Sequence, residues 1–136
     1  MTVVLDTNVL LVSIPQKSIY RPILDALIDG EFDLVLSNDI LSEYTEVIER
    51  KANTTVSNNI AEMLLNLDNL NKVEVYFEWK LIDKDPDDNK YVDAAIVGAA
   101  DFIVSNDHHF NILRSIDFPK VNVIGIDEFL DLIQKK

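Results

Sequence analysis

Acidic residues are the side chains of this sequence that could do chemistry. The chain has 136 residues, 24 of them Asp or Glu, and it has no cysteine. The lack of cysteine excludes disulfides, thiolate catalysis and cysteine-ligated zinc or iron–sulfur centres. Four acids flank apolar runs at well-separated points of the chain, namely Asp6, Glu43, Asp93 and Asp107. If these acids meet in space, a cation must join them for all to stay ionised.

Carboxylate oxygens without thiolate or imidazole partners select Mg²⁺ or Mn²⁺. Such ions activate water and stabilise the charge of an in-line attack on phosphate. The acids therefore predict hydrolysis of a phosphate ester. The residues alone leave phosphodiester and phosphomonoester substrates equally open.

Short apolar runs alternating with helical patterns must position these acids. The predicted strands are residues 3–5, 34–36, 73–77, 102–104 and 121–124. Apolar periodicity predicts helices around residues 19–28, 40–48, 60–67 and 129–133, with loops at 53–59 and 83–89. We expect Pro22 in a first helical turn, Gly30 just past that helix, and Asp127 as the cap of the last helix.

Several of the predicted strands are continuously apolar rather than alternating, which favours a sheet buried on both faces. Strands alternating with helices predict an α/β fold with a central parallel sheet. The length suits one domain spanning residues 1–136.

In such a sheet the acids fall at one edge. Asp6 closes the first strand, and Glu43 lies in the first turns of the helix after the second. Asp88 and Asp93 open the helix after the third strand, and Asp107 follows the fourth. Open parallel sheets bind ligands at the carboxyl ends of their strands. We therefore expect these acids to converge.

Each acid also has a structural interpretation. Glu43, at the flank of an apolar stripe, could equally complement the helix dipole. Asp93 shares a helix side with Ile96 and Ala100. A carboxylate there is costly unless it is paired or binds metal, and the alternative is an acid satisfied by backbone or arginine.

The remaining acids could serve local structure. Asp88 lies where a helix should start, so capping and metal binding are evenly matched. Asp6 could cap the helix that follows it, and Asp107 could be a turn residue. His108 and His109 are adjacent, which is a poor spacing for zinc ligands, and they are interpreted as turn or helix-start residues.

The net charge of the chain bears on its binding partners, and its N-terminal residues and apolar runs bear on its location in the cell. The formal net charge is −12, which repels nucleic acid unless metal offsets it locally, and which suits a basic partner peptide. The first residues lack a basic targeting region, and no apolar run approaches the roughly 20 residues that span a bilayer. We expect a cytoplasmic protein.

Four ordered segments resemble the motifs of a known family. They are residues 3–10, 37–47, 85–95 and 101–107. Together they resemble the acidic motifs of PIN-domain ribonucleases, in the branch of VapC-like toxins from toxin–antitoxin pairs. The resemblance implies a PIN-like three-layer α/β/α sandwich with a parallel sheet of about five strands. It also implies Mg²⁺- or Mn²⁺-dependent endonuclease action on RNA, a cognate antitoxin and a possible homodimer.

The resemblance also implies roles for single residues. Asp6, Glu43, Asp93 and Asp107 would be catalytic, and Asp88 would join Asp6, Asp93 and Asp107 as a metal ligand. Asn8 and Ser105 would support the first and last acids. Many relatives place a lysine where this chain has His108. The candidate RNA-binding residues are Lys17, Arg21, Lys84, Lys90 and Arg114.

Two other functions compete with a nuclease. A phosphatase with an aspartyl nucleophile usually needs a second Asp two residues on, and here that position is Asn8. A catalytically silent PIN-like scaffold or RNA-binding module usually lacks the acids, which this chain keeps.

Overall fold

The computed structural model describes residues 1–135, which form a central sheet flanked by helices. Within these residues the strands are all parallel, in the order β3-β2-β1-β4-β5. Their bounds are β1 Thr2–Leu5, β2 Asp33–Leu36, β3 Leu70–Lys72, β4 Phe102–Val104 and β5 Val123–Ile124. The predicted α/β fold with a five-stranded parallel sheet is confirmed.

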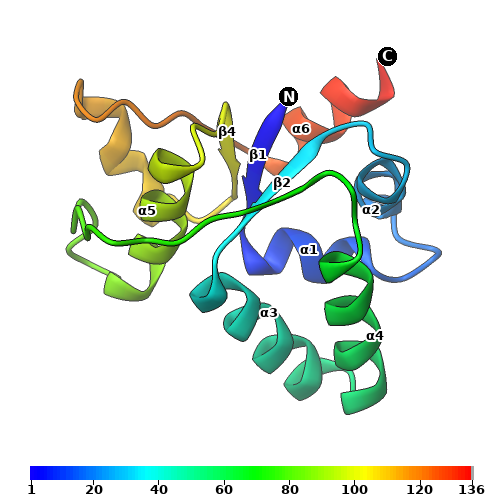
Figure 1. Cartoon of the computed structure of the whole chain (residues 1–136). Coiled ribbons are helices and arrows are strands. Elements are labelled where there is room, and N and C mark those ends of the chain that lie inside the picture. Colours follow the sequence, from blue (N-terminus) through cyan, green and yellow to red (C-terminus); the bar gives the residue numbers. More distant parts are fainter. Residues whose placement is uncertain (136) are drawn as a thin grey trace.

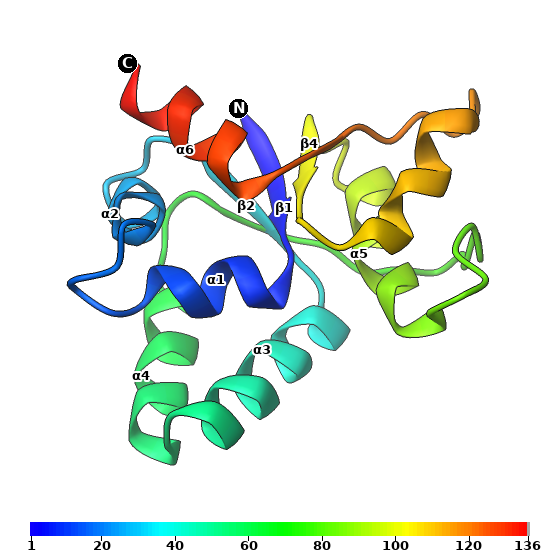
Figure 2. The ribbon, with the colours of Figure 1, turned by 180° about the vertical axis from the view of Figure 1, so that it is seen from behind.

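Helices cover both faces of the sheet and make the predicted three-layer sandwich (Figure 1; Figure 2). They are α1 Thr7–Ser13, α2 Arg21–Ile28, α3 Asn38–Lys51, α4 Thr54–Leu65, α5 Asn89–Val97 and α6 Ile126–Gln134, with the 3₁₀ helices η1 Pro86–Asp88 and η2 His108–Ser115. Helix α5 packs against β1, β2 and β4, while α2 and α6 pack together on the opposite side. No described helix is long and apolar enough to cross a bilayer.

The topology creates a crevice at the carboxyl ends of β1 and β4. From the central strand β1 the chain moves to β2 on one side, and it later returns to β4 on the other. Where neighbouring strands lead away in opposite directions, their carboxyl ends leave an open site for a ligand. Asp6 directly follows β1 and Ser105 directly follows β4, so both stand at this point.

The central strands are buried on both faces, as their continuous apolar sequences predict. Val3, Val4 and Leu5 of β1 are all fully buried, and so are the three apolar residues of β2. Burial of this kind contributes roughly 1.5–3 kcal/mol for each large apolar side chain. The sheet is therefore a rigid base for the residues at its edge.

Helix α3 is tied directly to the end of β1. Ser37 caps α3 by accepting a hydrogen bond from the backbone N–H of Ile40 over 3.2 Å. The hydroxyl of the buried Tyr44 donates to the carbonyl of Leu5 over 2.5 Å. This bond holds the first turns of α3, which carry Glu43, beside Asp6.

Helix α5 packs closely on the sheet because its end is a glycine. A Cβ at Gly98 would lie 2.8 and 2.9 Å from the two methyl groups of Val35 in β2. Such distances are well inside van der Waals contact, so no other residue fits there without a shift. The small residues of this segment thus set the depth of α5.

The third strand lies earlier than residues 73–77, where it was expected, and that prediction was wrong. The β3 ladder pairs Leu34 with Leu70, and the backbone N–H of Val73 makes the last bond to β2. Tyr76 is 88% exposed and Phe77 is 61% exposed. The apolar composition of this segment predicted burial, but the segment runs past the sheet edge toward α5.

Two predicted boundaries near helix starts were also wrong. Residues 53–59 were expected to form a loop, but α4 begins at Thr54 and Asn53 caps it by accepting from the N–H of Val56 over 2.8 Å. The last helix is capped by Gly125 and not by Asp127. Asp127 lies in the first turn and accepts a hydrogen bond from the hydroxyl of Tyr20.

Candidate metal centre

Asp6 presents a buried carboxylate at the end of β1. It is only 7% exposed, and its side chain makes no capping hydrogen bond to α1. Instead, Oδ2 accepts a hydrogen bond of 2.6 Å from the hydroxyl of Ser105. Burial raises the pKa of Asp6 despite the bonds from Ser105 and the Asn8 amide, and the charges of Asp107 and Glu43 raise it further. A cation nearby would offset this cost.

Asp107 is held beside Asp6 through Ser105. The Ser105 hydroxyl oxygen accepts a hydrogen bond of 2.9 Å from the backbone N–H of Asp107. The Asp107 carboxylate caps η2 by accepting from the N–H of His109 over 2.9 Å. Burial opposes ionisation of Asp107, but the His109 N–H and the contact with Asp88 outweigh it and lower the pKa. Asp107 therefore keeps a local structural role while facing the neighbouring acids.

Asp88 is the acid whose environment is least satisfied. It is 8% exposed, it makes no side-chain capping bond to α5, and its Oδ2 is buried with no hydrogen-bond partner. The capping side chain of η1 is Asp85, which accepts from the N–H of Asp87 over 3.2 Å. Burial, followed by the charges of Asp107 and Asp85, raises the pKa of Asp88 to about 7. The side chain of Asp88 therefore does not cap a helix.

His109 joins these acids although the sequence marked it only as a turn residue. Its backbone opens η2 together with His108, as predicted. Its Nδ1 lies 3.0 Å from Oδ1 of Asp107, 3.4 Å from Oδ2 of Asp88 and 3.7 Å from Oδ2 of Asp85. We call Asp85, Asp88, Asp107 and His109 the acid–imidazole cluster, because one ligand atom from each lies within 4.8 Å of the others.

Glu43 is held by three donors from two other helices. Oε2 accepts hydrogen bonds from the hydroxyls of Thr7, over 2.8 Å, and Tyr91, and Oε1 pairs with the ammonium of Lys90 over 2.8 Å. Burial opposes ionisation of Glu43, but the bonds from Lys90, Tyr91 and Thr7 outweigh it and lower the pKa. Glu43 is thus kept as a carboxylate near Asp6.

Asp93 is buried but turned away from this group. It is 4% exposed, and Oδ1 accepts a hydrogen bond of 3.1 Å from the backbone N–H of Trp79. Burial raises its pKa, and the neighbouring negative charge is Glu78. It lines a different cavity, together with Lys80 and Asp39. The structure therefore does not bring Asp93 together with Asp6, and its role as a metal ligand stays a prediction.

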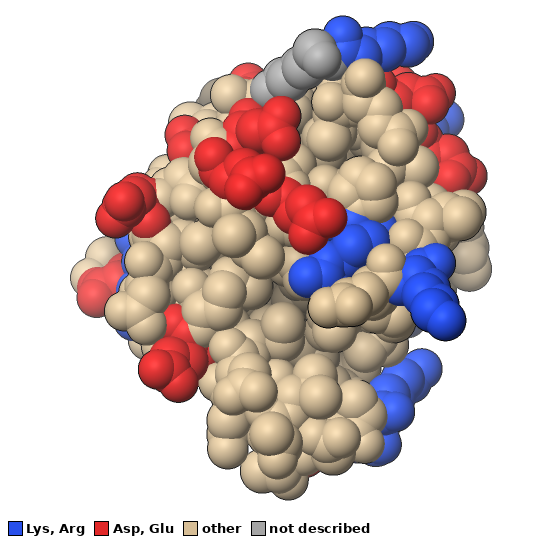
Figure 3. Space-filling view, turned by 90° about the vertical axis from the view of Figure 1, so that its right-hand side faces the viewer, with Lys and Arg blue, Asp and Glu red and all other residues tan. Residues whose placement is uncertain are grey.

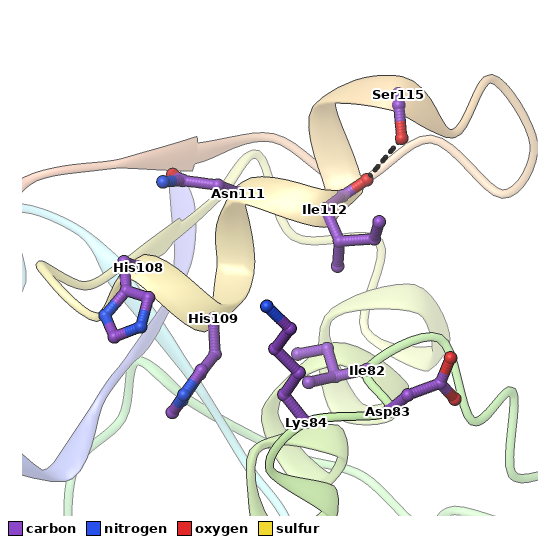
Figure 4. Close-up of a pocket in the computed structure, with 8 residues that line it drawn as sticks. All are labelled: Ile82, Asp83, Lys84, His108, His109, Asn111, Ile112 and Ser115. Carbon is purple, nitrogen blue, oxygen red and sulfur yellow. Dashed lines mark hydrogen bonds between the residues drawn. The ribbon is translucent and has the colours of Figure 1, made fainter.

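Two cavities border the acids. One, of about 440 Å³, is lined by Asp6, Asn8, Asn106 and Asp107 among others. Asn8 is exposed there, close to the acid that it was predicted to support. The other, of about 460 Å³, is lined by His109 and Lys84 among others, and Figure 4 shows the Lys84 side chain extending into it toward η2. The first cavity thus opens onto Asp6 and Asp107, and the second opens onto His109.

The predicted RNA-binding cations are differently placed. Lys90 is paired with Glu43, and the guanidinium of Arg21 is bonded to Asp25 over 2.9 Å and to the carbonyl of Ile14 over 2.5 Å. Lys17 and Arg114 are exposed. Contacts of all these residues with RNA stay predictions.

Sequence reasoning missed Asp85 and His109 as members of the cluster, and it missed Thr7 and Tyr91 as donors to Glu43. In each pair, at least one residue lies close in sequence to a predicted site residue. Asp85 and His109 stand three and two residues from predicted ligands, and Thr7 directly follows Asp6. Such spacing does not say where a side chain points, so the signal is weak.

Comparison with known proteins identifies the family and supports the fold. Residues 2–109 match the family model of the PIN domain. The chain is also similar in structure to the crystal structure of VapBC2 from Rickettsia felis bound to a DNA fragment from their promoter, with a TM-score of 0.61 and 15% sequence identity over 92% of this chain and 98% of that one. A search of curated proteins found no match. The family model spans most of the sequence, so the chain belongs to the PIN-domain family.

Proposed function

We propose that this chain is a metal-dependent endoribonuclease and the toxin of a toxin–antitoxin pair. One observation carries the metal part of the proposal. Oδ2 of Asp88 and Nδ1 of His109 are both buried without a hydrogen-bond partner, and both face Asp107. Buried polar atoms are almost always paired, and an unpaired one costs roughly 1–3 kcal/mol. A divalent cation among these atoms would remove that cost.

The residues divide the work of holding the cation. We infer that Asp6, Asp88 and Asp107 supply its oxygen ligands, since Asp88 interacts electrostatically with both other acids. Ser105 orients Asp6 and the backbone of Asp107 together. When bound, a divalent cation activates a water molecule and offsets the charge that develops on the phosphate. This assignment prefers Asp88 to Asp93.

Glu43 serves the site as a fixed negative charge at its border. Its three donors hold it ionised and fix its position, and its charge acts on Asp6. Lys90 and Tyr91 come from α5 and Thr7 from α1, so Glu43 joins three helices around the crevice. We infer that Glu43 holds these helices in position and so keeps Asp6 correctly placed to bind the cation.

The choice of RNA and of an antitoxin partner draws on the family and on the structural neighbour. The similar VapBC2 structure is a complex bound to promoter DNA. Two features support a ribonuclease toxin with an antitoxin partner here: the chain is a PIN domain that keeps its acids, and it shares the fold of the VapBC2 structure. On the face formed by α2 and α4, positive side chains do not gather into one continuous area (Figure 3). We therefore propose that RNA binds at the edge of the sheet where the strands have their carboxyl ends. There Lys84 lines the same cavity as His109 of the acid–imidazole cluster.

The test is cleavage of a mixed RNA pool with Mg²⁺ or Mn²⁺. We expect cleavage that EDTA abolishes and that Asp6→Asn and Asp88→Asn each reduce by at least about 100-fold, because a lost ligand removes several kcal/mol of stabilisation. Asp87→Asn is the matched control, since Asp87 is the exposed neighbour of Asp88. Absence of cleavage by the wild-type chain, with no metal-induced rise in melting temperature, would favour the scaffold function.

Asp93→Asn separates the role of Asp93, in α5, from that of Asp88, the last residue of η1. We expect it to keep most of the activity, within about fivefold, because the Asp93 carboxylate binds the Trp79 amide rather than the cluster. A loss as large as that of Asp88→Asn would return Asp93 to the metal site.

A further inference from the structure

We propose that the acid–imidazole cluster is a mixed carboxylate–imidazole site for a transition-metal ion such as Mn²⁺, and that Nδ1 of His109 is one of its ligands. The inference deepens the proposed function, because the site shares Asp88 and Asp107 with the proposed catalytic centre. It adds two residues, Asp85 and His109, that lie outside the acids expected from the sequence.

The distances around Nδ1 of His109 suit a shared cation better than direct bonds. Nδ1 stands 3.0 Å from Asp107 and 3.4 Å from Asp88, yet it has no hydrogen-bond partner. A direct N–H···O bond at 3.0 Å would be aligned, and this contact is not. Two ligands at about 2.1 Å from one ion and at right angles to each other lie about 3.0 Å apart. The atoms are therefore spaced like neighbouring ligands.

Burial singles out the same atoms. Asp88 is 8% exposed and its Oδ2 is unpartnered, and the free Nδ1 of His109 is buried against it. In the metal-free chain these two atoms cost stability when Asp88 is ionised, since the Asp88 carboxyl shares a hydrogen bond with Asp107 only while it holds a proton. Asp85 completes the set, with its Oδ2 3.7 Å from Nδ1.

A backbone hydrogen bond anchors His109 next to Asp107. The N–H of His109 donates to Oδ1 of Asp107 over 2.9 Å, so the residue that offers the imidazole is anchored to another ligand. His108, although adjacent, has a side chain that is 80% exposed, and its Nδ1 lies 3.9 Å from Oδ1 of Asp107. His108 can also group with Asp107 and His109, with one ligand atom from each within 4.8 Å of the others, but it is not part of the set that contains the buried Asp88.

An imidazole ligand changes which metal the site prefers. Oxygen-only sites accept Mg²⁺ and Mn²⁺ alike, whereas an added imidazole ligand favours a transition-metal ion over Mg²⁺. His109 therefore predicts tighter binding of Mn²⁺ than of Mg²⁺. It also predicts that the preference depends on His109 itself.

Pulsed electron paramagnetic resonance of bound Mn²⁺ tests the inference directly, because a ligated imidazole gives a ¹⁴N hyperfine coupling. The chain is used without affinity-tag histidines, so that His108 and His109 are the only imidazoles. We expect the coupling in the wild-type chain and in His108→Gln, and its loss in His109→Gln. Titrations should show that His109→Gln weakens Mn²⁺ binding at least about tenfold and changes Mg²⁺ binding less than about twofold.

Three results would overturn the inference: no nitrogen coupling in the wild-type chain, coupling that persists in His109→Gln, or coupling lost in His108→Gln. Unchanged circular dichroism and metal-free melting temperature verify that His109→Gln folds. Nitrogen coupling without RNA cleavage would support the site and reject the nuclease. Cleavage without nitrogen coupling would do the reverse.

Discussion

The hydroxyl of Ser105 donates a 2.6 Å hydrogen bond to Oδ2 of Asp6, and it accepts one from the backbone N–H of Asp107. A single serine thus joins the carboxyl ends of β1 and β4 and orients two proposed metal ligands. A hydrogen bond to a metal-binding carboxylate controls both its position and its basicity.

Ser105→Ala should weaken the metal site without unfolding the protein. We expect Mn²⁺ affinity to fall about tenfold, since loss of an outer-shell partner commonly costs 10–100-fold. Calorimetric titration measures the change. Ser115→Ala is the control, because the Ser115 hydroxyl donates to the Ile112 carbonyl on the exposed part of η2. Equal affinities for wild type and Ser105→Ala would remove Ser105 from the site.

The raised pKa of Asp88 predicts that metal binding strengthens with pH. Its pKa is about 7 in the folded, metal-free chain, so binding below that value must displace a proton. Between pH 5.5 and 7.5 we expect Mn²⁺ affinity to rise at least about tenfold. The slope should be smaller in Asp88→Asn. A pH-independent affinity in the wild type would show that Asp88 does not bind the ion.

The same pKa gives metal-free stability the opposite trend. Because the folded pKa lies above the ordinary value of 3.8, the folded state holds the proton more tightly. The contribution of Asp88 is therefore greatest at low pH and declines as pH rises from about 4 to about 7. Urea unfolding of wild type and Asp88→Asn should diverge over this window and converge below it.

Lys90→Met should destabilise the chain at neutral pH and not in acid. The bond from Lys90 helps to lower the pKa of Glu43 below 4.5, so its stabilisation is present above that pH and is lost as pH falls through the lowered value. For this partly buried pair we expect a loss of about 1–2 kcal/mol at pH 7. Urea denaturation measures it, with Lys120→Met at an exposed position as the control. A loss that is the same at acid pH would mean that packing, and not charge, is responsible.

Gly98→Ala should push α5 away from the sheet. The new methyl group would lie 2.8 and 2.9 Å from the side chain of Val35, and overpacking of a core costs about 1–3 kcal/mol. Thermal unfolding measures the loss. Gly30→Ala offers a contrast, because nothing lies within 4 Å of its Cβ position and only its positive φ of 77° opposes the change. If Gly98→Ala leaves the melting temperature unchanged, α5 can shift away from the sheet more easily than its packing indicates.

The order of apolar and acidic residues along the chain was enough to predict the sheet and the edge at which the acids gather. Continuous apolar runs such as residues 3–5 specify strands buried on both faces, and alternation with helices makes those strands parallel. Because parallel strands end at one edge, the positions of Asp6 and Asp107 just after two strands sufficed to place them together. The same reasoning wrongly predicted a strand at residues 73–77. Apolar residues that are exposed beyond an edge strand cannot be distinguished by sequence from buried ones.

Which side chains face the crevice depends instead on how the helices pack against the sheet. Asp88 and Asp93 both open the same helical segment, but five residues turn a helix by roughly 140° beyond a full circle, so the two carboxylates point to different sides. Apolar neighbours predicted the burial of Asp93 correctly and could not predict that its partner is the Trp79 amide. His109 shows the same limit, because its place among three acids depends on contacts between segments far apart in the chain, which local spacing does not encode.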